Sequence, residues 1–242
     1  MNKPLIIGNW KMHPESASDA LKLCEKIKKG ASTFRNVSVV VAPPFPFLYP
    51  MKSLTRSKSF ALGAQDVFWE LSGSYTGEVS PSMLSLLGVR FVIVGHSERR
   101  ALGENDEMVN KKIRATLKVG LTAVLCIGES FRDKSGAYLG FLENQIRLAL
   151  SKVLVQSFSQ IVIAYEPLWA IGEKAERSMK PQEVQESVLY IRKILSHMYG
   201  KNSAFSIPVL YGGSVDETNA RELLTEGNIS GILVGRASRN SE

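Results

Sequence analysis

Three residues could together move a proton, and each follows a short apolar run: Lys11, His96 and Glu166. Glu166 precedes Pro167, which fixes the backbone direction, so its carboxylate could act as a general base; a salt-bridged glutamate at a strand end is the alternative. His96 precedes a predicted helical turn, whose positive end favours a neutral imidazole, although a packed histidine bonded to the backbone would show the same pattern. Lys11 could balance negative charge on a substrate, but most lysines are simply solvated.

Glycines near the C-terminus predict a phosphate site. A Gly-Gly-Ser segment spans residues 212–214, and Gly235 precedes Arg236, each directly after an apolar run. Glycine lets backbone N–H groups approach an anion closely. Ser214 and Glu217 also match a capping box, which predicts that a helix begins at this serine. The alternative is that these glycines only form tight turns.

Eight short apolar runs provide the elements that must position these side chains. The runs are continuous rather than alternating with polar residues, which is typical of parallel strands buried on both faces. Helical patterns fill the gaps between them, for example at Val184, Val188, Ile191 and Leu195. The eight runs are residues 5–7, 37–42, 60–62, 91–94, 122–127, 161–164, 208–210 and 231–234.

Strands that alternate with helices predict an α/β fold, and eight of them favour a (β/α)₈ barrel over residues 1–242 as a single domain. The rival is a doubly wound open sheet. No G-x-G-x-x-G follows the first strand, which removes the usual dinucleotide-binding form of that rival. In a barrel the chemistry lies at the carboxyl ends of the strands, where the proton-moving residues and the glycines all fall.

Composition narrows the function classes. The 242 residues are 44% hydrophobic and 22% charged, as in an ordinary globular domain, and no apolar stretch approaches the twenty or so residues of a membrane span. A signal-peptide pattern is absent, so we expect a cytoplasmic protein. The net charge of +7 favours acidic partners, but the basic residues are spread out, so nucleic acid is not expected. Three histidines and two cysteines offer no metal-ligand spacing, so no metal is expected.

Six motifs at the predicted strand ends resemble those of the triosephosphate isomerase family, in order over about residues 5 to 238. The resemblance implies a (β/α)₈ barrel that interconverts dihydroxyacetone phosphate and glyceraldehyde 3-phosphate through an enediolate without a cofactor. The motifs are Asn9-Trp10-Lys11-Met12, Thr76-Gly77-Glu78-Val79-Ser80, Gly95-His96-Ser97-Glu98-Arg99-Arg100, Cys126-Ile127-Gly128-Glu129, Ala164-Tyr165-Glu166-Pro167 through Gly172, and Tyr211-Gly212-Gly213-Ser214-Val215.

The resemblance also implies a role for each matching residue. Glu166 would be the base, His96 the neutral electrophile and Lys11 the cation that stabilises the enediolate, with Asn9 orienting the substrate. Glu98 would form a supporting ion pair. Cys126 and Glu129 would pack near the site. Phosphate would be bound near Gly172, Ser214, Gly235 and Arg236.

A homodimer and a mobile lid are further implications of the resemblance. The loop from Gln65 to Glu78 would reach into the neighbouring subunit, with Thr76 near its active site; a surface-packed Ω-loop is the alternative. Its aromatic residues are typical of an interface. The lid would run from Pro167 to about Met179, and its second half, 173–180, is longer and more charged than the family pattern.

Two further departures from the family pattern lead to a second hypothesis. Arg236 stands where the family usually has a glycine, and the sequence apparently lacks most of the final C-terminal helix, so we expect bare apolar surface beside the first and eighth strands. These departures, with the unusual lid, leave open an impaired or repurposed phosphosugar-binding barrel. Intact Lys11, His96 and Glu166 argue for catalysis.

Overall fold

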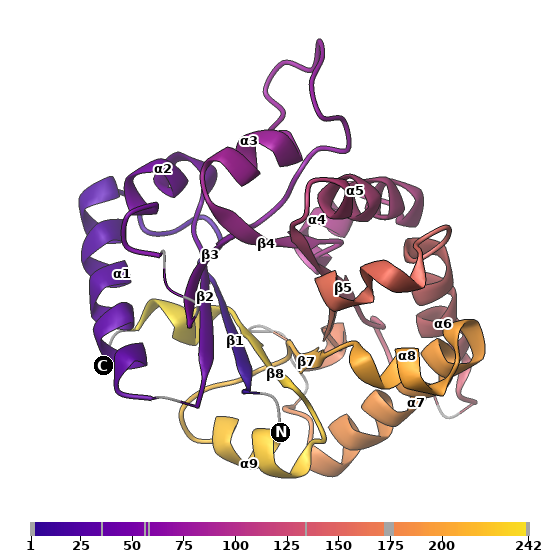
Figure 1. Ribbon diagram of the computed structural model, residues 1–242. Coiled ribbons are helices and arrows are strands. Elements are labelled where there is room, and N and C mark those ends of the chain that lie inside the picture. The colour runs from indigo at the N-terminus through magenta and orange to yellow at the C-terminus, as the bar shows by residue number, and fades with distance from the viewer. Residues whose placement is uncertain are drawn as a thin grey trace.

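The computed structural model describes residues 3–34, 36–55, 57, 59–133, 135–171 and 177–240. Eight parallel strands form a closed barrel in the order β1 to β8, and helices surround it (Figure 1). The predicted (β/α)₈ fold is therefore confirmed. The strands are β1 (Leu5–Asn9), β2 (Ser38–Ala42), β3 (Phe60–Ala64), β4 (Val89–Val94), β5 (Thr122–Ile127), β6 (Ile161–Tyr165), β7 (Val209–Tyr211) and β8 (Gly231–Val234).

The helices follow the strands along the chain. The α-helices are α1 (Ala17–Ser32), α2 (Leu48–Met51), α3 (Pro81–Leu86), α4 (Ser97–Ala101), α5 (Asp106–Lys118), α6 (Ala137–Ala149), α7 (Pro181–Tyr199), α8 (Lys201–Ser206) and α9 (Ala220–Glu226). Short 3₁₀ turns are η1 (Phe45–Phe47), η2 (Val155–Gln160), η3 (Leu168–Ala170) and η4 (Arg236–Arg239).

Side-chain caps fix several helix starts. Ser16, Ser80 and Asn105 each accept a hydrogen bond from the backbone N–H three residues later, which satisfies one of the unpaired donors of the first turn. The predicted capping box at Ser214 is wrong, because α9 begins only at Ala220. The Ser214 hydroxyl instead donates to the carbonyl of Ala170, 2.8 Å away.

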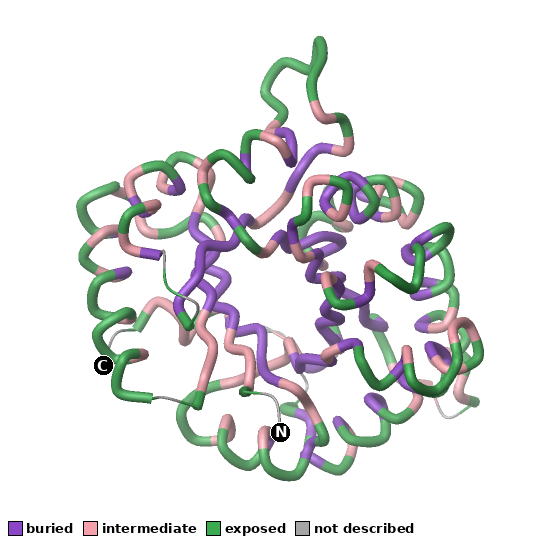
Figure 2. The backbone as a smooth tube through the Cα atoms, in the orientation of Figure 1, coloured by how far each residue is buried: buried purple, intermediate pink, exposed green. Residues whose placement is uncertain are grey.

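Apolar side chains fill two layers, which is why the strand sequences do not alternate. One cluster, including Ile7, Ile93 and Cys126, fills the barrel interior. A larger one, including Cys24, lies between the strands and the helices. Figure 2 shows buried strands inside a ring of helices whose outer surfaces are exposed. Both cysteines are free and buried, as expected of reduced thiols that pack as small hydrophobic groups.

An apolar groove of about 260 Å³ lies between α1 and α9, over the outer faces of β1 and β8. It is the region in which the sequence predicts bare apolar surface. Ile6, Val39 and Ile232 line it, together with Trp10, whose indole N–H is buried and has no hydrogen-bond partner among the described residues. The last described element, η4, lies beside β1.

A buried ionic cluster joins the loop after β3 to α4 and α5. The Lys112 ammonium lies 2.6 Å from an Asp66 carboxylate oxygen and 2.9 Å from a Glu104 oxygen. Glu104 also accepts the backbone N–H of Gly95 at 3.0 Å, next to His96. Burial raises the pKa of Asp66, and the charge of Lys112 opposes that shift. The buried Lys112 ammonium therefore fixes Glu104, and Glu104 in turn fixes the backbone at the end of β4.

Replacing this cation should destabilise the fold. Lys112→Met leaves buried carboxylates without their closest counter-charge, and removing one partner of a buried pair typically costs about 3–5 kcal/mol. The neighbouring Lys111→Met is the matched control, because its exposed i,i+4 pair with Glu107 should contribute under about 0.5 kcal/mol. Urea unfolding of both variants measures the difference. Equal losses of stability would show that the cluster is not coupled to folding.

Candidate active site

A cavity of about 320 Å³ opens at the carboxyl ends of the strands. Seven residues expected in the site line it, coming from β1 and the segments that follow β1, β4, β6, β7 and β8. These seven are Asn9, Lys11, His96, Glu166, Ser214, Gly235 and Arg236. Glu98, Cys126, Gln65 and Thr76 are not in its wall. Gly172 and residues 173–176 of the expected lid lie outside the described residues.

Glu166 follows β6 and is buried, with 4% of its surface exposed. One carboxylate oxygen lies 3.4 Å from His96 Nε2, and the other accepts the Ser97 backbone N–H at 3.4 Å. A Cβ at position 212 would lie 2.9 Å from Glu166 Cγ, so only glycine leaves the carboxylate its place. The pKa of the Cys126 thiol is raised by burial and then by the Glu166 charge, so this thiol stays protonated beside the carboxylate.

His96 precedes α4, as its position before a predicted helical turn suggested. Its Nδ1 atom accepts the backbone N–H of Glu98 at 3.2 Å. An accepting Nδ1 carries no proton, so the ring proton is on Nε2, which faces Glu166. The helix start therefore fixes the tautomer, and a neutral N–H donor points toward the base.

Lys11 has a left-handed backbone with φ of 53°, which costs free energy for any residue other than glycine. Neighbouring groups hold it there: Gln65 Nε2 donates to the Lys11 carbonyl at 2.8 Å, and the Asn9 side chain accepts the Lys11 N–H at 3.0 Å. The ammonium lies 2.6 Å from a Glu98 oxygen. Gln65, the first residue of the expected dimer loop, directly contacts the backbone of Lys11.

The expected phosphate side of the cavity is built from loops rather than a helix start. Residues 212–214 follow β7, and the Gly212 N–H donates to the Tyr165 carbonyl at 2.8 Å. Gly235 ends the loop after β8, and Arg236 begins η4. A Cβ at Gly235 would touch Lys11 Cε at 3.4 Å, so the last strand brings its glycine against the catalytic candidate of the first.

Glu129, expected to provide packing and support near the site, is the centre of a polar network below the first residues of the lid. It is 1% exposed, and one oxygen accepts the Tyr165 hydroxyl at 2.8 Å and the Trp169 indole N–H at 2.9 Å. Arg132 donates to the same oxygen at 3.1 Å and lies 5.3 Å from the Trp169 ring centre. Sequence reasoning missed Arg132; its spacing three residues after Glu129 was the available signal.

A second cation reaches the same tryptophan from the other side of the lid. The Arg177 guanidinium lies 5.3 Å from the Trp169 ring centre and forms a two-pronged pair with Glu183 near the start of α7. This pair lowers the pKa of Glu183 to about 2. Residues on both sides of segment 172–176 are therefore joined through Trp169.

The geometry combines a buried carboxylate, a neutral N–H donor and an ammonium at one cavity. Such a set can take a proton from carbon next to a carbonyl and stabilise the oxyanion that forms. No group of three His, Cys, Asp or Glu side chains with metal-binding geometry occurs within the described ranges. In the same part of the chain, no helix is long and apolar enough to cross a bilayer.

Comparison with known proteins gives one family. A family model described as triosephosphate isomerase matches residues 4–242. Triosephosphate isomerase of Thermoanaerobacter sp. (strain X514) is 42% identical over 240 residues, covering 98% of this chain and 95% of that protein. The Pelobacter propionicus protein of the same name is 43% identical, covering 98% and 94%. That of Carboxydothermus hydrogenoformans is 40% identical over 247 residues, covering 100% and 96%.

The tautomer of His96 can be tested directly. We expect ¹⁵N NMR of histidine-labelled protein at neutral pH to show a protonated Nε2 and an unprotonated Nδ1 for this ring, because Nδ1 accepts the Glu98 N–H. His96→Gln, which removes one of only three histidine signals, provides the assignment. A proton on Nδ1 would contradict the hydrogen bond on which the orientation depends.

Proposed function

Because this chain belongs to the triosephosphate isomerase family, we propose that Glu166, His96 and Lys11 carry out its isomerase reaction at the mouth of the barrel. The enzyme interconverts dihydroxyacetone phosphate and D-glyceraldehyde 3-phosphate, an aldose–ketose step of glycolysis and gluconeogenesis. The observation that carries the assignment is the convergence of a base, a neutral donor and a cation in one cavity. No feature of the fold favours a repurposed phosphosugar-binding barrel.

Each of the three side chains has a distinct part in the proton transfer. Glu166 removes a proton from the carbon beside the carbonyl and returns it to the neighbouring carbon, which exchanges ketose and aldose. His96 donates its Nε2–H to the oxygen that becomes negative and moves a proton between the two oxygens of the enediolate. Lys11 stabilises the intermediate by charge. A base paired with preorganised donors in this way lowers the barrier mainly through electrostatics.

Two neighbouring residues, the acidic Glu98 and the amide Asn9, position these groups. Glu98 holds the Lys11 ammonium at 2.6 Å, and its backbone N–H sets the His96 ring. A substrate oxygen that approaches Lys11 would share the ammonium with this exposed carboxylate. Asn9 accepts the Lys11 backbone N–H and lines the cavity, so its amide can orient the substrate.

The phosphate group would lie near Ser214, Gly235 and Arg236, with Gly172 completing the site. Main-chain N–H groups at glycines supply donors, and the Arg236 guanidinium adds a fork of donors that fits phosphate. No cofactor or metal is needed for the reaction. We also propose that residues 1–242 fold as a single domain and that the enzyme acts in the cytoplasm.

A homodimer is part of the proposal. The loop between β3 and α3 projects beyond the ring of helices (Figure 1). The centre of its Phe68 ring lies 4.2 Å from that of Trp69 and 4.7 Å from that of Tyr75, so the three aromatic side chains pack against one another. Nearby exposed apolar side chains support an interface, since Leu86 is 77% and Leu102 is 79% exposed.

Activity is tested by the initial rate of glyceraldehyde 3-phosphate conversion to dihydroxyacetone phosphate. We expect rapid turnover and a loss of at least about a hundredfold in Glu166→Gln or His96→Gln, because each removes the proton acceptor or the oxyanion donor. Glu166→Gln also controls for contaminating isomerase. A folded variant that keeps near-normal turnover would refute the role given to its residue.

Dimer formation is tested at the tip of the projecting loop. Thr76→Arg places a charged side chain where we propose contact with the partner's active site, so sedimentation should show monomers and turnover should fall at least about tenfold. Thr225→Arg, on the exposed side of α9, is the matched control and should remain dimeric. A dimeric and active Thr76→Arg variant would place the interface elsewhere.

A further inference from the structure

A second cavity, of about 420 Å³, lies behind Glu166. We call it the rear cavity. It lies between α4, the start of α5, the loop after β5, α6 and η3, and Ser97 and Glu166 line both it and the substrate cavity. We propose that the rear cavity binds a small, neutral, planar molecule with an amide group, and that such a ligand slows the isomerase through Glu166.

The apolar walls suit a ring. Ile127 lines the cavity from the end of β5, Leu168 from the start of η3 and Phe141 from α6. Phe141 is 50% exposed although it is a large apolar side chain on an amphipathic helix. A planar ligand against this ring would bury apolar surface that otherwise meets water. The volume falls within the range of small-molecule sites.

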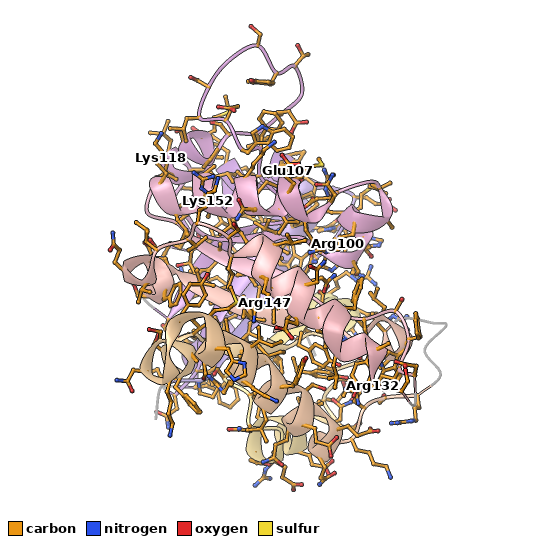
Figure 3. All side chains as sticks on the ribbon, turned by 90° about the vertical axis from the view of Figure 1, so that its right-hand side faces the viewer. Arg100, Glu107, Lys118, Arg132, Arg147 and Lys152 are labelled. Atoms are coloured by element: carbon orange, nitrogen blue, oxygen red, sulfur yellow. The ribbon has the colours of Figure 1, made fainter. Side chains whose placement is uncertain are left out.

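The charged groups of the rear cavity disfavour an anion. The Arg100 guanidinium lies 2.7 Å from an Asp106 oxygen and donates to the Gly95 carbonyl at 2.7 Å, so its charge is already paired. Glu166 adds a carboxylate to the same wall, so a negatively charged ligand would lose water and meet like charge, whereas a neutral ligand can offer this carboxylate a donor. Figure 3 shows the side of the molecule on which α5 and α6 lie, with Arg100 and Arg132 labelled.

Gln145 supplies the polar contact. Its side chain is 3% exposed, and its Oε1 accepts the Gly128 N–H at 3.0 Å. Gln145 also lines the rear cavity, so the NH₂ group of its amide can meet a ligand there. Such a donor favours a ligand with a carbonyl oxygen.

The link to catalysis rests on the proposed function of Glu166. The far carboxylate oxygen accepts the Ser97 N–H at 3.4 Å, which is a long contact. An amide N–H of a ligand in the rear cavity would add a donor to this carboxylate. A donor stabilises the charged form and weakens the base. The substrate cavity stays open, so kcat should fall while KM is unchanged.

Benzamide is a suitable probe, with benzoate as its charged analogue of the same shape. We expect calorimetry to give a benzamide Kd on the order of 1 mM, a reasonable affinity for nine heavy atoms, and benzoate to bind at least about tenfold more weakly. A crystal grown with benzamide should show the ring beside Phe141. Saturating benzamide should lower kcat by about three- to tenfold, without competing with substrate.

Two variants outside the catalytic machinery test the location. Ala101→Trp fills the cavity from the exposed end of α4, and Phe141→Ala removes the ring wall; both should weaken benzamide binding at least about tenfold and leave basal turnover unchanged. Phe34→Ala removes another exposed phenylalanine, one that does not line the cavity, and should change nothing.

The possible results separate the two proposals. Three results would overturn the rear site. The first is no binding of benzamide at a concentration 20-fold above about 1 mM, and the second is purely competitive inhibition. The third is that Ala101→Trp and Phe141→Ala bind benzamide as tightly as the parent protein. Variant-sensitive binding without any isomerase activity in the parent protein would retain the site and refute the proposed function instead.

Discussion

The barrel closes where β8 pairs with β1, and this seam depends on Gly231. Its φ of 155° is a conformation that side chains disfavour, and a Cβ there would overlap the Leu5 carbonyl. Leu5 pairs with Gly231 at the start of the seam, and Gly8 pairs with Val234 toward its end. Because the seam is parallel, the first and last strands deliver Lys11 and Gly235 to the same edge. A closed sheet is thus what brings the two ends of the chain into one site.

Electrostatics at this edge are arranged by backbone groups more than by side-chain pairs. The His96 tautomer is set by a main-chain N–H at the start of α4, and the Lys11 carbonyl is fixed by a side-chain amide from the next but one strand. Both contacts orient a reactive group without adding charge to the site. The charged groups of the site, among them Lys11 with its partner Glu98 and the buried Glu166, are thereby held in place before a substrate binds.

Much of the fold could be predicted from the sequence, because strands covered on both faces must be apolar along their whole length. The run at residues 208–210 predicted β7 although only three residues pair there. The local sequence predicted a capping box at Ser214, and this prediction was wrong. The Ser214 hydroxyl instead donates to the carbonyl of Ala170, 44 residues away in the sequence. The contact of Gln65 with the Lys11 carbonyl could not be assigned in advance, because β1 and β3 bring these two residues together only in the folded barrel.

The candidate catalytic residues stood out from the sequence because each lies where a strand ends, and all such ends meet. Their hydrogen-bond partners could not be predicted, because a hydrogen bond to a backbone atom does not depend on the type of residue that supplies the atom. Glu129 illustrates this: its position after β5 suggested packing, whereas three donors converge on one of its oxygens. Strand ends predict where chemistry lies, and tertiary contacts decide how it is oriented.

The two buried cysteines give this chain internal reporters of its own opening. Burial raises the pKa of Cys24 to about 12 and that of Cys126 well above its ordinary value, so neither is a thiolate at neutral pH. Cys24 lies on α1, against the outer layer, and Cys126 lies inside the barrel. The rate at which a thiol reagent modifies Cys24 therefore reports how often α1 separates from the barrel. The rate at Cys126 reports how often the sheet itself opens, in the same molecule.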